Sequence, residues 1–295
     1  MGRRSLLASA LIACCCAHPG GAQPEKPCYA FLRSQDLHVT CGKDSGQITY
    51  RRNIDRFAVS EERSYLAFLT SQITKRTATS ADAVYTTTLV DLRSGRLSQM
   101  AGQVFGDHTL VGTCGGIFRA ADPRNEHSGS TDLITGAQID MSPYRWFVCS
   151  SDLRVVFGNL GARGGEGNLY EGRPPVLKVP ALGKYDFYTY NISPDGSKIV
   201  YETGSRPLCV LSSPGPPECA PEALGEDFEL SVNNDGEVLI EERDLDGHIG
   251  IDYWRTGLNS LEVIESYGGA PQWISPGTAE LLLKWSAQQD RKPAR

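Results

Sequence analysis

Short apolar runs, rich in β-branched and aromatic residues, alternate with polar turn sequences along most of the chain. Residues 65–68, 199–201 and 238–240 are such runs, and each follows a segment rich in Gly, Ser, Asn or Asp. Short apolar runs bounded by turn residues are typical of β-strands, whereas helices need longer segments with a wider period. The pattern therefore predicts an all-β protein.

One turn phrase recurs along the chain. Asp-Leu-Arg-Ser-Gly at residues 91–95 is matched by Asp-Leu-Ile-Thr-Gly at residues 132–136, which begins 41 residues later. Residues 252–257 carry the phrase a third time with one inserted residue. Because Gly accepts positive φ and Asp, Ser and Thr bond back to the backbone, each copy predicts a hairpin turn between two strands.

A second phrase lies between these copies and consists of an aromatic residue, a nearby Ser, a turn and an apolar strand. Its fullest form continues from Tyr190 into Ser-Pro-Asp-Gly at residues 193–196. The aromatic positions are Phe57, Phe147, Tyr190, Phe228 and Trp273. The last four are separated by 43, 38 and 45 residues. The last copy predicts a strand over residues 281–283.

A period near 40 residues with about four short strands per unit is the signature of a β-propeller blade. The units begin near residues 57, 104, 147, 190, 228 and 272, which predicts six four-stranded blades. The last unit has room for two strands, and two further strands are expected around residues 37–41 and 47–51. These N- and C-terminal strands would together close one blade. An open or irregular β-structure is the alternative.

The repeats also resemble a known family. Ser-Pro-Asp-Gly-Ser-Lys-Ile-Val-Tyr at residues 193–201 and Asp-Leu-Arg-Ser-Gly-Arg-Leu at residues 91–97 look like the repeat of TolB-like (WD-like) β-propellers. The resemblance covers roughly residues 55–285 and implies the propeller fold. It implies little about function, because propellers of this kind serve many roles.

The N-terminus predicts export. Arg3 and Arg4 precede a short apolar run over residues 5–13, which is typical of a secretory signal peptide. Two processing sites are open: cleavage after Ala22, giving a signal over residues 1–22, or a lipoprotein signal over residues 1–13 with Cys14 lipidated. A single β-propeller domain is expected over residues 28–285, followed by a polar disordered tail over residues 286–295. The localisation expected is periplasmic, extracellular or lipid-anchored at the cell envelope.

The chain beyond the signal contains an even number of cysteines, which suggests disulfides in an exported protein. They are Cys28, Cys41, Cys114, Cys149, Cys209 and Cys219. Proximity favours Cys28–Cys41 and Cys209–Cys219, which leaves Cys114–Cys149. Separately buried thiols are the alternative, and their spacings fit no zinc site.

Charge narrows the class of partner. The formal net charge is −6, which argues against nucleic acid or an anionic membrane surface, since both require a basic face. Association with a membrane is expected only through an N-terminal lipid. The sequence contains no complete catalytic constellation, no metal-ligand spacing and no phosphate-binding context that would indicate a cofactor.

Three long loops on one face of the expected propeller, at residues 71–83, 119–131 and 158–168, indicate where a partner binds. Arg and aromatic residues, the types enriched at binding hot spots, are found there and in the loops between blades. The candidate binding residues are Arg119, Arg124, His127, Tyr144, Trp146, Arg163, Tyr185 and Trp273. For Trp146 and Trp273, packing between blades is the alternative.

The sequence thus favours a non-catalytic binding or scaffold module for a protein or small ligand. A propeller-type hydrolase or lyase with its active site at the channel mouth is the alternative.

Overall fold

The structure is a computed structural model. It describes residues 27–50, 53–76, 81–102, 110–111, 118–119, 130–139, 146–151, 155–159, 167–171, 190–202, 207–212, 215–223, 229–243 and 246–289. The predicted signal segment, Cys14 and Cys114 lie outside these residues. Within them, no helix is long and apolar enough to cross a membrane.

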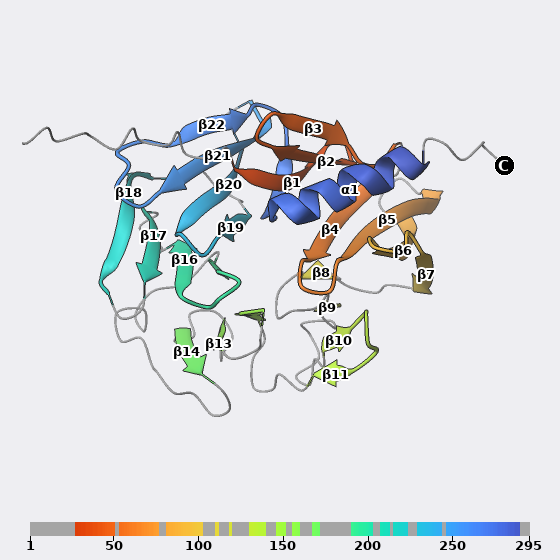
Figure 1. Ribbon diagram of the computed structural model, residues 1–295, viewed down its shortest axis with the longest axis horizontal. Coiled ribbons are helices and arrows are strands. Elements are labelled where there is room, and N and C mark those ends of the chain that lie inside the picture. Colours follow the sequence, from red (N-terminus) through yellow and green to blue (C-terminus); the bar gives the residue numbers. More distant parts are fainter. Residues whose placement is uncertain are drawn as a thin grey trace, which may run out of the picture.

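The protein is built from antiparallel sheets placed side by side around a common centre (Figure 1). Most of these sheets have four strands, and strands next to each other in the chain are neighbours in each sheet, as the repeat pattern predicts. One four-stranded sheet consists of β4 (Ile54–Ser60), β5 (Tyr65–Arg76), β6 (Ala81–Asp91) and β7 (Leu97–Gly102). The next four-stranded sheet consists of β8 (Leu110–Val111), β9 (Phe118–Arg119), β10 (Ser130–Asp132) and β11 (Gln138–Ile139).

The next sheets follow the same order along the chain. They consist of β12 (Trp146–Cys149), β13 (Val155–Asn159) and β14 (Gly167–Glu171); then β15 (Tyr190–Ile192), β16 (Lys198–Glu202), β17 (Pro207–Ser212) and β18 (Pro217–Ala223); then β19 (Leu230–Val232), β20 (Glu237–Arg243), β21 (Ile249–Arg255) and β22 (Glu262–Glu265). This architecture confirms the all-β prediction.

A sheet of mixed origin joins the two ends of the chain. Its order is β23 (Gly269–Trp273), β1 (Cys28–Arg33), β2 (Asp36–Cys41) and β3 (Asp44–Gln47). β23 pairs antiparallel with β1, placing Tyr29 opposite Trp273. The sequence predicted shared strands, but it divided them wrongly: the N-terminal segment supplies three strands rather than two. β3 ends at Gln47, so the strand expected over residues 47–51 is absent from the described residues 47–50.

The repeated turn phrase has one geometry in its first two copies. Asp91 accepts hydrogen bonds from the backbone N–H of Arg93 (2.9 Å) and from the Ser94 hydroxyl (2.7 Å). Asp132 accepts the corresponding bonds from Ile134 (3.1 Å) and Thr135 (2.6 Å). The glycine that ends each phrase has positive φ, 70° in Gly95 and 72° in Gly136. The third copy differs, because Asp252 is a buried residue within β21 and the inserted residue moves the turn past it.

The C-terminal element is a helix, α1 (Pro276–Gln289), where the sequence predicted a strand over residues 281–283 and a disordered tail from residue 286. Ser275 caps the helix: its hydroxyl accepts a bond from the Thr278 N–H (3.3 Å), and Pro276 fits the first helical position, which needs no N–H donor. The buried positions include Thr278, Leu282 and Trp285, a spacing that fits one helix face.

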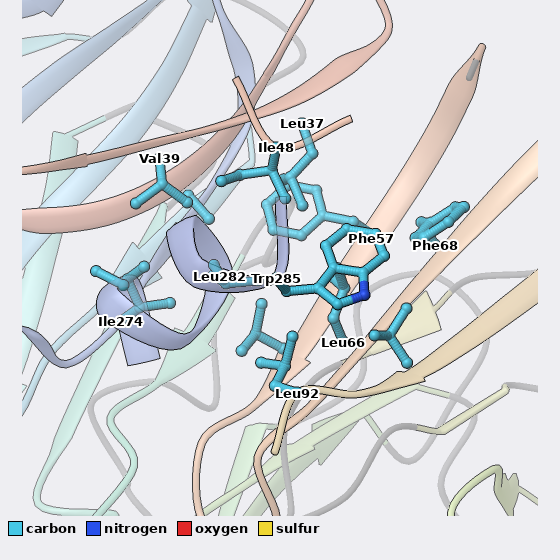
Figure 2. Close-up of a cluster of buried hydrophobic side chains, with 14 of the residues drawn as sticks. Leu37, Val39, Ile48, Phe57, Leu66, Phe68, Leu92, Ile274, Leu282 and Trp285 are labelled. Atoms are coloured by element: carbon cyan, nitrogen blue, oxygen red, sulfur yellow. The ribbon is translucent and has the colours of Figure 1, made fainter. Parts of the chain in front are cut away.

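Helix α1 packs in the core between the mixed sheet and the β4–β7 sheet (Figure 2). Leu282 and Trp285 are almost fully buried there. They belong to a cluster with Leu37, Val39 and Ile48 from the mixed sheet and its connection, and with Phe57, Leu66, Phe68 and Leu92 from the β4–β7 sheet and its turn. The cluster joined by α1 therefore contains residues from both ends of the chain.

Two of the predicted disulfides are present. Cys28 is bonded to Cys41 across β1 and β2, and Cys209 is bonded to Cys219 across β17 and β18. The third predicted pair cannot be placed, because Cys114 and the Cys149 side chain lie outside what the structure describes.

Candidate functional site

Most of the predicted binding residues lie where no side chain is described. Arg119 and Trp146 are placed only as strand positions, in β9 and β12. Arg124, His127, Tyr144, Arg163 and Tyr185 lie outside the described residues. Among the predicted binding residues, only Trp273 has a described side chain.

Trp273 links two sheets. Its indole N–H donates to the backbone oxygen of Ser231 (3.1 Å), and its backbone N–H donates to the Ser231 hydroxyl (3.1 Å). Its ring meets Tyr253 edge-on, with 6.4 Å between the ring centroids. These are the contacts of a half-buried residue that packs β23 against the β19–β22 sheet.

The two ends of the ring differ in their contacts. We call the side on which the innermost strands β4, β15, β19 and β23 begin the start face, and the side on which they end the turn face. The turn face carries the hairpin turns that come directly after these strands, including residues 61–64, 193–197 and 233–236. The start face carries residues 53–56, 229 and 268–270 together with the distal ends of the β5–β6 and β20–β21 hairpins.

Contacts between neighbouring turns occupy the turn face. The Asp195 N–H donates to the Asn234 side chain (3.0 Å), and the Ser151 N–H donates to the Pro194 oxygen (2.7 Å). Arg63 forms an ion pair with the buried Asp132 at 2.5 Å, which joins the β4–β7 and β8–β11 sheets. Burial opposes ionisation of Asp132, but bonds from Thr135 and Arg63 prevail and lower its pKa. These turn residues hold the sheets together.

Ionisable groups converge on the start face near the centre of the ring. Arg56 on β4 forms an ion pair with Glu229, which lies just before β19. Both side chains keep more than two-fifths of their surface exposed. Glu241 on β20 accepts a hydrogen bond from the backbone N–H of Ala270. Burial raises the pKa of Glu241, and the neighbouring Glu229 carboxylate acts in the same direction.

The backbone is constrained where β23 begins. Ala270 has a φ of 51°, in the left-handed region that a non-glycine residue rarely adopts. A Cβ added to Gly269 would lie 2.9 Å from the Glu241 carboxylate, so a larger residue there would require this side chain to shift. Sparsely populated backbone conformations are often found at functional sites, because the surrounding structure must hold them in place.

Aromatic and basic groups lie farther from the centre on the same face. Arg33 packs over the Phe31 ring at 5.2 Å, pairs with Glu265 and donates to the Tyr267 backbone oxygen (2.9 Å). The Tyr267 side chain meets His248 edge-on at 5.6 Å between centroids, and Tyr267 is 60% exposed. The start face thus offers an exposed aromatic ring beside acidic and basic side chains.

Arg56, Glu229 and Glu241 were missed by the sequence reasoning. Arg56 and Glu229 each lie next to an aromatic residue of the repeat, Phe57 and Phe228, so charged residues beside these positions were the signal that could have indicated them. Within the described ranges, no group of three or more His, Cys, Asp or Glu residues is placed to hold a metal ion. The arrangement is suited to ion pairing and aromatic contact with a partner.

Comparisons with known proteins show the fold. A comparison with protein-family models found no match, and a comparison with curated proteins found none either. Among solved structures, TolB from Acinetobacter baumannii is similar with a TM-score of 0.56 at 15% identity, covering 83% of this chain and 65% of that one. An acylaminoacyl peptidase from Pyrococcus horikoshii is similar with a TM-score of 0.51 at 12% identity, covering 81% of this chain and 43% of that one.

The chain therefore spans less than two thirds of the length of these structures. The β-propeller domain of the Trilobed protease from Pyrococcus furiosus also matches, with a TM-score of 0.46 at 14% identity, 79% of this chain and 74% of that one being covered. Together with the antiparallel sheets of this chain, the similarity to TolB identifies the fold as a β-propeller.

Proposed function

We propose that the protein is an exported binding module of the TolB-like propeller type, with six four-stranded blades and no catalytic role. The antiparallel sheets support this count, with the mixed sheet as the blade that joins the two ends of the chain. The two disulfides support an oxidising compartment, since disulfides persist mainly in exported proteins. The similarity to TolB supports the propeller type.

The observation that carries the binding function is the difference between the two faces. The turn face is occupied by contacts that hold neighbouring sheets together. The start face also carries contacts between sheets, but its Arg56–Glu229 pair is half-exposed and its Tyr267 is exposed. Arg and aromatic side chains supply most of the energy of many interfaces. The partner, a protein or a small ligand, therefore docks on the start face.

The test compares two triple variants of the full chain. The first variant replaces by alanine the arginines expected in the long loops, which are Arg119, Arg124 and Arg163. The matched control replaces Arg96, Arg255 and Lys284, which are exposed elsewhere in the described structure. Arg93 is excluded from the control because it donates to Ser64. Partner is captured from the envelope and culture medium of the source cells with immobilised wild type.

The loop variant is expected to lose binding, because truncating a central hot-spot arginine costs about 2 kcal/mol or more. The control is expected to bind as wild type does. Equal loss in both variants, or loss in the control alone, would contradict docking on the start face. Export is tested separately by mass spectrometry of the mature protein, which is expected to begin at a lipidated Cys14 or near Gln23. A mature protein that still begins at Met1 would contradict export.

A propeller-type hydrolase is the second candidate, and only the similarity to the acylaminoacyl peptidase favours it. It requires a substrate-cleaving site at the mouth of the ring. Assay of the purified full chain against blocked aminoacyl and peptide substrates tests it. If the purified chain cleaves these substrates, and the loop variant does so as well, the protein is a hydrolase and not a binding module. A preparation that is free of contaminating peptidase must give the same cleavage.

A further inference from the structure

The β5–β6 hairpin extends beyond the sheet to which it belongs. β5 and β6 pair with each other as far as Arg76 opposite Ala81. The register shifts once, between Ile73 and Lys75. Within the described residues, the strands on either side of the hairpin stop much earlier: β4 pairs with β5 only to Thr70, and β7 pairs with β6 only to Tyr85. The sequence predicted a loop over residues 71–83, and most of it is instead a two-stranded ribbon on the start face.

The first residue of β4 bonds to the mixed sheet. Asn53 has a φ of 48°, and the Ile54 N–H donates to the backbone oxygen of Gln35 (2.8 Å) in the β1–β2 turn. Residues 48 and 49 bond to the same sheet, because their N–H groups donate to the Leu37 backbone oxygen. Among the described strands, none pairs with residues 71–76 of β5 on the side that β4 occupies farther down.

A strand edge of this kind presents backbone N–H and C=O groups in the spacing that another strand requires. Natural proteins usually shorten, cover or charge such edges, because they invite pairing with other chains. This edge is charged at one end only: residues 71–76 read Ser-Gln-Ile-Thr-Lys-Arg and contain no acidic residue, in a chain of net charge −6. Ile73 is 56% exposed there, so an apolar side chain is available to a partner.

We propose that the β5 edge over residues 71–76 receives an extended, acidic segment of the partner as an added strand. Main-chain hydrogen bonds supply the affinity in this mode of recognition, and side chains on alternate positions supply the specificity. The acidic character follows from Lys75 and Arg76, the two charged residues of the edge, which are both basic. The inference rests on the proposed function, because it specifies the partner that docks on the start face.

The probes are three fluorescein-labelled peptides of about eight residues, a common strand length. The first alternates Glu with Val and Thr, the second has Lys in place of every Glu, and the third is the first with alternate backbone amides N-methylated. Fluorescence anisotropy with the full chain measures binding. The Glu peptide is expected to bind about tenfold more tightly than either of the others, because it alone offers both the charge and the ladder. Equal binding of all three, or no saturation by the Glu peptide, overturns the proposal.

Variants of the edge locate the binding. Lys75→Glu with Arg76→Glu is expected to reverse the preference between the Glu and Lys peptides. Gln72→Pro and Ile73→Pro form a matched pair, because successive residues of a strand direct their N–H groups to opposite edges and proline has none. One of the two is expected to lower the melting temperature by removing a bond to β6. The other is expected to keep the melting temperature and lose peptide binding about tenfold. Wild-type peptide binding in that second variant overturns the proposal.

Partner capture and peptide binding distinguish docking on the start face from strand addition. If the triple loop variant loses the captured partner while no peptide binds, docking on the start face is retained and strand addition is wrong. If the Glu peptide binds at the edge while the triple loop variant keeps its partner, strand addition is retained and the arginine loops are not the partner's site.

Discussion

Gln272 joins two neighbouring sheets through one side-chain amide. Its amide oxygen accepts from the Val59 N–H (2.9 Å), and its amide N–H₂ donates to the Val59 backbone oxygen (2.8 Å). β23 and β4 belong to different sheets, so no backbone ladder connects them. The Gln272 side chain bonds to Val59 as the backbone of a neighbouring strand would. Together with the bonds from Trp273 to Ser231, it ties β23 to the sheets on both sides.

Gln272→Ala is expected to lower the free energy of unfolding by about 2 kcal/mol, because it leaves both backbone groups of Val59 without this partner. Gln272→Glu keeps an acceptor for the Val59 N–H, but only its protonated carboxyl can also donate to the Val59 oxygen. Its loss of stability is therefore expected to be smaller than that of the alanine variant when the carboxyl is protonated. Urea unfolding monitored by tryptophan fluorescence measures both. An unchanged midpoint in the alanine variant would show that the amide carries no stability.

Glu241 is expected to give the stability a distinct pH dependence. Burial raises the pKa of Glu241 above its ordinary value, so the native state holds this proton more tightly than the unfolded chain does. Its contribution is therefore fully present below the unfolded pKa and is lost as the pH rises through the folded pKa. Glu241→Gln should remove this fall, since the amide oxygen still accepts from the Ala270 N–H.

Urea unfolding midpoints measured across acidic and neutral pH test this pH dependence. The control is Glu280→Gln, which changes an exposed carboxyl on α1. The control is expected to follow the wild-type profile. If Glu241→Gln also follows it throughout, the proton on Glu241 does not affect folding.

Helix α1 contributes to stability as an element because it fills the space between two sheets. Trp285→Ala is expected to cost about 3–5 kcal/mol, the usual range for removing a large aromatic side chain from a core. Lys284→Ala, on the exposed side of the same helix, is expected to change stability by less than about 0.5 kcal/mol. Denaturant unfolding of both variants measures the difference. Similar values for the two would mean that the helix is not part of the core.

Local turn chemistry allowed the sequence to predict the strands but not this helix. Ser275-Pro276 looks like Ser193-Pro194, and the sequence interpretation gave both the same turn. The two segments differ in their next residues, because Gly196 with its positive φ reverses the chain, whereas Thr278 begins a helical face that continues through Leu282. The run of three leucines over residues 281–283 was read as a strand because it is short and apolar, although only Leu282 of the three is buried.

Candidate site residues are harder to predict, because they meet across the ring. Arg56 and Glu229 are 173 residues apart in the sequence, and the ion pair forms only when the closed ring brings together two sheets that lie on either side of the mixed sheet. The close approach of Gly269 to Glu241 likewise depends on the packing of β23 against β20. Trp273 could be recognised from its place in the repeat, but whether it packs or binds depends on Ser231, a neighbour that no periodicity identifies.

The Cys28–Cys41 disulfide stabilises the sheet that joins the two ends of the chain, because it links β1, which pairs with β23, to β2. Replacing both cysteines by serine is expected to lower the free energy of unfolding by about 3 kcal/mol, the typical effect of releasing a loop of this size. Thiol titration of the denatured, unreduced wild type should find no reaction at Cys28, Cys41, Cys209 or Cys219. Reaction at all four would contradict both disulfides.

The pairing of β1 with β23 also determines the order in which the chain can fold. Residues 28–47 leave the ribosome before the other sheets, yet their own sheet lacks its innermost strand until residues 269–273 have been made. Closing a longer loop costs little additional free energy, about 0.6 kcal/mol for each doubling of its length, but contacts distant in sequence form slowly. The first hairpin must therefore wait with one edge and its apolar residues uncovered while every other sheet is synthesised. A protein built in this way is most exposed to aggregation and proteolysis during its production, before the last residues arrive.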